Sequence, residues 1–251
     1  MLFTLLILPT ISLVSQEEPD DLPWLFEQYD AEEAQQSDWE SIGERISDLA
    51  NEGYLPVGFE LRPRPSVLYI RNEGLPFTQW TIHEFEDPQN FEANFGAFLD
   101  EGWLPMDIAR SENGIVALFV GAESSINGWR LTGVEMDSEA IAEEIAGYRE
   151  EGFTPWGLTP TEGGVWILLL REAGTVATDT SIQSYPADDV LAISEGVTSE
   201  ILHGNFIPWG LMIHGETATV QYIRSEEHQP DFDPDELQDM DDDPGVLNPI
   251  D

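Results

Sequence analysis

Carboxylates are the groups in this 251-residue chain most able to do chemistry. There are 50 Asp and Glu residues against nine Arg and no Lys, which gives a formal net charge of −41. Paired carboxylates can act as general acid and base, but pairs arise by chance when acids are this frequent. The same charge argues against nucleic acids and anionic membranes as partners, because both require basic patches. There is no Cys, which excludes disulfides, thiolate nucleophiles and thiolate metal sites.

The segment 225–251 contains the one spacing that resembles a metal site. Asp239, Asp241 and Asp243 alternate as in the first half of a calcium-binding loop. Pro244 stands where that loop needs Gly, and its final Glu is missing. We therefore expect weak association with Ca²⁺ at most, and no other cofactor. The alternative is a solubilising tail, since the segment carries 11 acidic residues and no Lys or Arg and is predicted to be disordered.

Two tryptophans and the histidines are the remaining candidates. Trp156 and Trp209 each stand one residue after the proline of a repeated motif. Aromatic rings there could form a platform for a sugar or a peptide, and the alternative is packing in the core. The histidines do not have the spacing of a metal site. We assign no catalytic residue.

The repeated motif organises the chain. It occupies residues 52–59, 101–108, 151–158 and 203–211, and its prolines recur every 49 to 53 residues. Gly53, Gly102 and Gly152 stand where a helix ends in the left-handed conformation, and Asn205 takes that place in the fourth copy. A period of this size predicts an array of supersecondary units.

Each copy of the motif predicts the end of a helix followed by a β-hairpin, with a further strand before the helix. The predicted helices are 37–51, 88–101, 138–151 and 188–203. The predicted units are 23–73, 74–122, 123–173 and 174–224. A helix between the first and second strands favours a parallel arrangement of these two, with the third strand antiparallel beside them. We predict an α+β fold of four tandem β-α-β-β repeats, each a helix packed on a three-stranded sheet, paired two by two; a propeller is the alternative.

The N-terminus predicts export. Residues 2–14 are an apolar run too short to span a bilayer, and an acidic leader at 16–22 follows. We interpret 1–15 as a signal peptide, which predicts a periplasmic or secreted protein without stable membrane insertion after cleavage. The net charge suits saline surroundings, because salt screens self-repulsion. The alternative is an acidic secreted protein from an ordinary environment.

The order of helix, Glu-Gly-aromatic and hairpin resembles a small bacterial domain of unknown function. The signature of that domain is a helix followed by E-G-W-E-L-V in a β-α-β-β fold. Residues 101–104 (Glu-Gly-Trp-Leu) and 151–154 (Glu-Gly-Phe-Thr) match its opening, and the likeness covers roughly 24–224 as four copies. This chain has Pro where the acidic-aliphatic pair of the signature continues. The resemblance implies the fold and brings no catalytic residues.

Together these patterns predict an exported acidic repeat protein with a binding or structural role at the cell envelope or outside the cell, and no catalytic activity. Its partner would be an unidentified protein or glycan, and its oligomeric state is open. One alternative is a secreted hydrolase with a carboxylate pair in a cleft between pairs of units. The other is a calcium-responsive surface adhesin.

Overall fold

Four β-α-β-β units follow one another along the chain, as the repeats predict. The computed structural model describes residues 24–29, 39–62, 65–71, 79–111, 114–121, 126–172 and 179–224. Units 1 and 2 contain β1 (Trp24–Gln28), α2 (Trp39–Asn51), β2 (Tyr54–Glu60), β3 (Ser66–Arg71), β4 (Trp80–Phe85), α3 (Pro88–Asp100), β5 (Trp103–Arg110) and β6 (Ile115–Gly121). Units 3 and 4 contain β7 (Ile126–Val134), α4 (Ser138–Glu150), β8 (Thr154–Pro160), β9 (Val165–Glu172), β10 (Asp179–Pro186), α5 (Val190–Gly204), β11 (Ile207–His214) and β12 (Thr217–Arg224). The predicted mixed α+β class is therefore confirmed.

Each unit forms its own three-stranded antiparallel sheet with its third strand in the middle. The strand orders are β1-β3-β2, β4-β6-β5, β7-β9-β8 and β10-β12-β11. The first and second strands both run antiparallel to the third, so they are parallel to each other, as the helical connection predicts. The third strand, however, lies between them and not beside the pair. A tight hairpin pairs it directly with the second strand, which leaves its other edge for the first strand.

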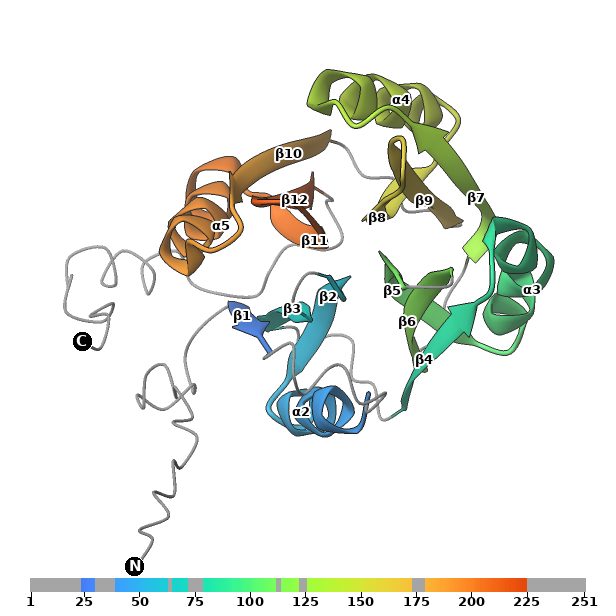
Figure 1. Ribbon diagram of the computed structural model, residues 1–251, viewed down its shortest axis with the longest axis horizontal. Coiled ribbons are helices and arrows are strands. Elements are labelled where there is room, and N and C mark those ends of the chain that lie inside the picture. Colours follow the sequence, from blue (N-terminus) through green and yellow to red (C-terminus); the bar gives the residue numbers. More distant parts are fainter. Residues whose placement is uncertain are drawn as a thin grey trace, which may run out of the picture.

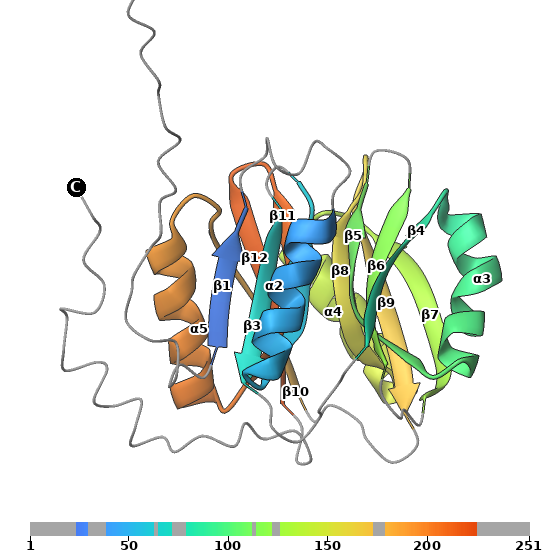
Figure 2. The same cartoon turned by 90° about the horizontal axis from the view of Figure 1, so that it is seen from below.

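The four sheets surround a common centre. The second strands β2, β5, β8 and β11 lie innermost, and each contacts the second strands of both neighbouring units (Figure 1). The helices form the outer rim, with strands and helices running roughly along the same direction (Figure 2). Contacts thus pass all the way round, and the expected pairing two by two is not confirmed. The radial arrangement is the one that the propeller alternative would give, combined with a helix on each unit.

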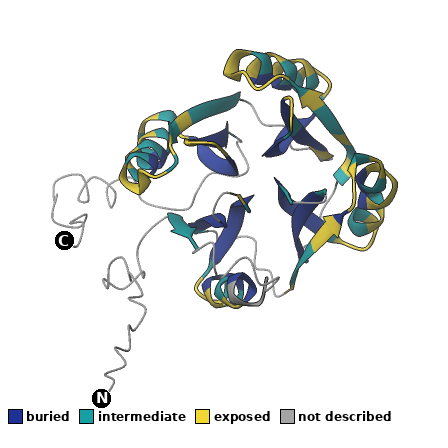
Figure 3. Ribbon diagram, viewed as in Figure 1, coloured by how far each residue is buried: buried dark blue, intermediate teal, exposed yellow. Residues whose placement is uncertain are grey.

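Burial follows this radial order. Every residue of β2 and β8 is buried, whereas β1 and β7 on the outside are only partly buried or exposed. Figure 3 shows buried strands around the centre and exposed faces on the helices. The second strands are covered on both sides because they face the other units inward and their own helix outward. Such strands appear in the sequence as nearly continuous apolar runs.

Helices α2, α3 and α4 each contact the first strand of the next unit, which is β4, β7 and β10 respectively. In the first of these seams, Trp80 of β4 lies directly over Gly43 of α2, where a Cβ atom would clash with the indole ring. Trp80 Nε1 also donates a hydrogen bond to Ser47 Oγ at 2.9 Å. A helix is therefore shared between two units, and it protects the open edge of the neighbouring sheet from pairing with other chains.

The helix ends have the predicted left-handed residue. Gly53, Gly102 and Gly152 have φ of 89°, 87° and 83°, and Asn205 has φ of 53°. These residues stop the helix and turn the chain inward toward the second strand.

A pair of Gly→Ala variants tests this assignment. Gly102→Ala is expected to lower the free energy of unfolding by about 1–2 kcal/mol, because a Cβ atom disfavours the left-handed conformation. Gly147→Ala, inside α4 and facing open space, is expected to raise it by about 0.5–1 kcal/mol through better helix propensity. Urea unfolding followed by tryptophan fluorescence measures both. Equal effects of the two variants would contradict the cap assignment.

Candidate functional site

Two acidic side chains lie buried at the centre of the ring. Glu60 on β2 and Asp107 on β5 are both 0% exposed. Asp107 stands two residues after the motif proline, where the other units have Gly58, Gly157 and Gly210. The sequence analysis did not single out either acid. The sequence does contain a signal for Asp107, because this position of the motif is glycine in the other three units.

The carboxyl group of Asp107 joins the units. Its Oδ2 accepts hydrogen bonds from the backbone N–H of Phe59 in unit 1 at 2.8 Å and of Leu211 in unit 4 at 3.1 Å. Its Oδ1 accepts from the N–H of Ile108 in its own unit at 2.8 Å. Gly157 of unit 3 lies so close that a Cβ atom there would clash with Oδ1. One side chain therefore contacts all four units.

A β-bulge in the second strand creates this arrangement. In each second strand the register with the third strand shifts just after the motif proline, as between Pro105 and Asp107. Proline has no N–H to donate to the ladder, so a β-bulge is favoured there. The bulge leaves backbone N–H groups of Phe59 and Leu211 directed at the centre, where Asp107 accepts them.

Glu60 makes a second link between units. Its Oε2 accepts from the N–H of Ile213 in unit 4 at 3.3 Å. Its Oε1 accepts from the N–H of Leu61 at 2.7 Å and of Arg62 at 3.4 Å. The contact with Ile213 spans units 1 and 4, which are the two ends of the repeat array. Glu60 therefore helps to close the ring.

Burial changes the acidity of both groups. It raises the pKa of Glu60 to about 8, against the opposing effect of the three backbone N–H donors and of the Arg62 charge. It also raises the pKa of Asp107 well above its usual range, with a smaller contribution from the nearby Glu60 charge; again three N–H donors oppose the shift. A carboxyl group with such a pKa can act as a general acid near neutral pH. Here, however, both side chains are enclosed and bonded to the backbone, which suits them to holding the units together.

The two tryptophans singled out from the sequence do come together, but inside the protein. The rings of Trp156 and Trp209 meet in a T-shaped contact with centroids 5.0 Å apart, and the residues are 3% and 2% exposed. Trp156 Nε1 donates to the carbonyl oxygen of Pro105 in unit 2. A surface platform for a sugar or peptide needs an open ring face, so the core-packing alternative describes these residues. They are buried because they lie on the innermost strands.

A buried polar side chain, Gln221, lies beside this pair. Gln221 on β12 donates from Nε2 to the carbonyl oxygens of Pro155 at 3.0 Å and Trp209 at 2.7 Å. It thereby connects unit 4 to unit 3. The centre is thus held by side chain-to-backbone hydrogen bonds across all four seams of the ring.

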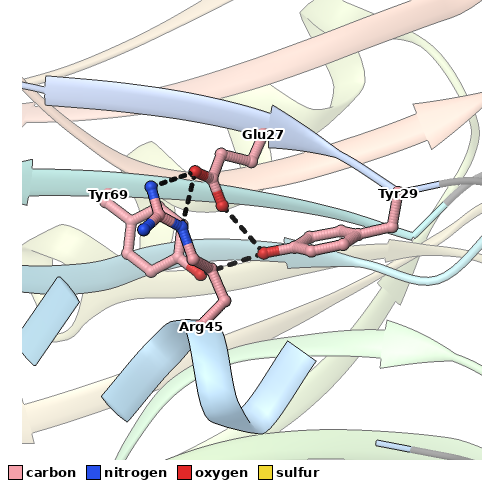
Figure 4. A network of polar contacts seen from close by, with 4 residues as sticks. All are labelled: Glu27, Tyr29, Arg45 and Tyr69. Atoms are coloured by element: carbon pink, nitrogen blue, oxygen red, sulfur yellow. Dashed lines mark hydrogen bonds and ion pairs between the residues drawn. The ribbon is translucent and has the colours of Figure 1, made fainter. Parts of the chain in front are cut away.

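A separate network fixes the first strand of unit 1. Glu27 on β1 accepts two hydrogen bonds from Arg45 of α2, at 2.7 and 2.9 Å, and one from the Tyr29 hydroxyl at 2.9 Å (Figure 4). The Tyr29 and Tyr69 hydroxyls lie 3.5 Å apart. Burial raises the pKa of both tyrosines, which keeps the phenols protonated. The network attaches β1 to β3 and α2, and its partly exposed ion pair adds little to stability by itself.

The predicted calcium ligands Asp239, Asp241 and Asp243 lie outside the described residues, as do the predicted signal peptide at 1–15 and the tail at 225–251. Within the described ranges, no group of three or more His, Asp or Glu side chains is placed to hold a metal ion. Over the same ranges, none of the helices has the length and apolar character needed to cross a bilayer.

Comparison with known proteins adds no assignment. Neither a scan of protein-family models nor a search of curated proteins finds a match to this chain. The resemblance to the small bacterial domain therefore stays a prediction.

Proposed function

We propose that this is an exported, non-catalytic protein with a binding or structural role at the cell envelope or outside the cell. The observation that supports its non-catalytic part is the bonding of Asp107, whose carboxyl accepts backbone N–H groups from three units. Its export part rests on the apolar run at residues 2–14. The most buried acids are thereby used to hold a ring together. The outer rim is then the surface available to a partner.

The chemistry of that rim favours neutral or cationic partners. The exposed residues on and beside the helices include many acids and few bases. They include Glu44, Asp48, Glu92, Asp100, Glu139, Glu143, Glu150 and Glu195. A surface of this kind repels anions over roughly 8 Å at physiological ionic strength and over less in brine.

Cell fractionation of the native host tests the export part of the proposal. The protein is expected in the envelope or the medium, with a mature N-terminus near residue 16, and a variant lacking residues 2–14 is expected to stay inside the cell. A pull-down from the envelope should then capture its protein or glycan partner. A cytoplasmic protein that retains Met1 would rule the proposal out.

A further inference from the structure

A recess lies at the seam between units 2 and 3. It has a volume of about 330 Å³ and is lined by Glu92 of α3, by Trp129, Arg130 and Leu131 of β7, and by Tyr148 of α4. This volume is at the lower end of the range for small-molecule sites. Two half-buried aromatic residues and two exposed residues of opposite charge therefore line one small space. Trp129 borders it on the side of α3, and Tyr148 borders it on the side of α4.

The matching seam between units 1 and 2 has a tryptophan over a glycine. Trp80 and Trp129 occupy equivalent places, because they pair with Val120 and Leu170 at the same register of their sheets. Trp80 covers Gly43 of α2 directly. Gly43 follows the buried Ile42 on α2. The equivalent residue on α3 follows the buried Phe91, and it is Glu92 and not glycine. The Trp129 seam therefore differs from the Trp80 seam at this position.

The floor of the recess is rigid. The Trp129 ring makes edge contacts with Phe91 and Phe95 of α3, with centroids 5.9 and 4.9 Å apart. These buried neighbours fix the plane of the indole. A fixed aromatic ring gives contact area at a low cost in conformational entropy.

Arg130 is also held in place. Its guanidinium carbon lies 5.8 Å from the centre of the Tyr148 ring and 5.3 Å from that of Phe153. Its Nη2 lies 3.8 Å from Glu151, which is a long and exposed ion pair. A guanidinium has five N–H donors, so stacking and this single contact leave donors for a ligand.

We propose that this recess binds one ring of a neutral saccharide. The C–H face of the sugar would lie on Trp129, and Tyr148 would border it from the α4 side. Arg130 would donate to hydroxyl oxygens, and Glu92 would accept from hydroxyl groups. The net charge of −41 disfavours an anionic ligand. A cationic ligand would be attracted to the acids over most of the rim and not to this recess in particular, where Arg130 would repel it. The inference rests on the proposed binding role and names the ligand class.

Saturation-transfer NMR and calorimetry on the full chain test the proposal. The probes are cellohexaose, chitohexaose and mannohexaose, with hexagalacturonate as the anionic counterpart. At least one neutral probe is expected to bind, with saturation transferred to its ring protons. Arg130→Ala and Glu92→Ala are each expected to weaken that binding about tenfold, because each removes a hydrogen bond to a charged group. Arg110→Ala is the matched control, since Arg110 is a partly exposed arginine paired with Glu162 and does not line the recess.

Three outcomes would overturn the inference: no binding of any neutral probe at millimolar concentration, unchanged affinity in Arg130→Ala, or tighter binding of hexagalacturonate. Unchanged thermal melting of both variants excludes loss of folding as the cause of weaker binding. The two proposals fail separately. An exported protein that captures an envelope partner but binds no saccharide refutes only the recess, whereas a cytoplasmic protein that binds a saccharide refutes only the export.

Discussion

Replacing Asp107 with glycine, the residue at this place in the other three units, is expected to lower the free energy of unfolding by about 3 kcal/mol or more. The substitution removes the acceptor of three buried N–H groups, those of Phe59, Ile108 and Leu211. Each buried donor without a partner costs about 1–3 kcal/mol. Guanidinium unfolding in molar NaCl, followed by tryptophan fluorescence, measures the change.

Two controls separate the role of the carboxyl from that of glycine itself. Asp137→Gly removes a carboxylate that also accepts two backbone N–H groups, at 3.0 Å each, but at the exposed start of α4. It is expected to cost only a few tenths of a kcal/mol, about what glycine costs at an N-cap. Asp107→Asn keeps one acceptor oxygen and places an amide against the third donor, so we expect roughly half the loss of Asp107→Gly. Equal stability of Asp107→Gly and the natural protein would show that the ring does not depend on this carboxyl.

Stability is expected to fall as the pH rises from about 4.5 to about 8, because Glu60 is buried. Its pKa is raised from 4.5 to about 8 in the folded protein. The unfolded chain therefore loses this proton at lower pH than the folded chain does, and the stabilisation present below pH 4.5 is lost progressively up to pH 8. The shift corresponds to an upper value of roughly 5 kcal/mol from this one group.

The variant Glu60→Gln isolates that contribution. Glutamine does not ionise, so the variant should lose most of the decline between pH 5 and pH 8 and should be the more stable protein at pH 9. Below pH 4.5 it should be weaker by about 1 kcal/mol, because its amide cannot accept all three N–H groups that Glu60 accepts. Unfolding curves at constant molar NaCl limit the effect of surface repulsion. Parallel curves for the two proteins would mean that Glu60 has an ordinary pKa.

Local structure could be predicted from the sequence because local residues determine it. Gly102 and Asn205 marked helix ends. At the starts of α3 and α4, the side chains of Asp87 and Asp137 accept backbone N–H groups of the first turn, as is common for Asp at a helix start. Phe91 and Phe95 stand four residues apart and form the buried face of α3. These features need only the residues of one turn, so they repeat in each unit whatever surrounds it.

The ring and its centre could not be predicted in this way. The place of each third strand depends on which edge remains open after the hairpin has formed, and the order of units depends on contacts such as those of β2 with β11, at opposite ends of the array. The local sequence around Trp156 and Trp209 allowed both packing in the core and a surface platform. Asp107 was one acid among 50, and only the assembled units reveal that its neighbours are backbone donors from other repeats.

The position of Asp107 also has a consequence for how such a ring can arise. Four identical subunits around a rotation axis would bring four copies of any axial side chain into the same space, and their carboxylates would repel one another. Here the equivalent residues Gly58, Gly157 and Gly210 have no side chain, and a Cβ atom at Gly157 would clash with the Asp107 carboxyl. In a homotetramer all copies have the same sequence, so one copy cannot have Asp where the other three have Gly. Joining the repeats in one polypeptide permits this asymmetry, so the carboxyl of a single residue can contact all four units.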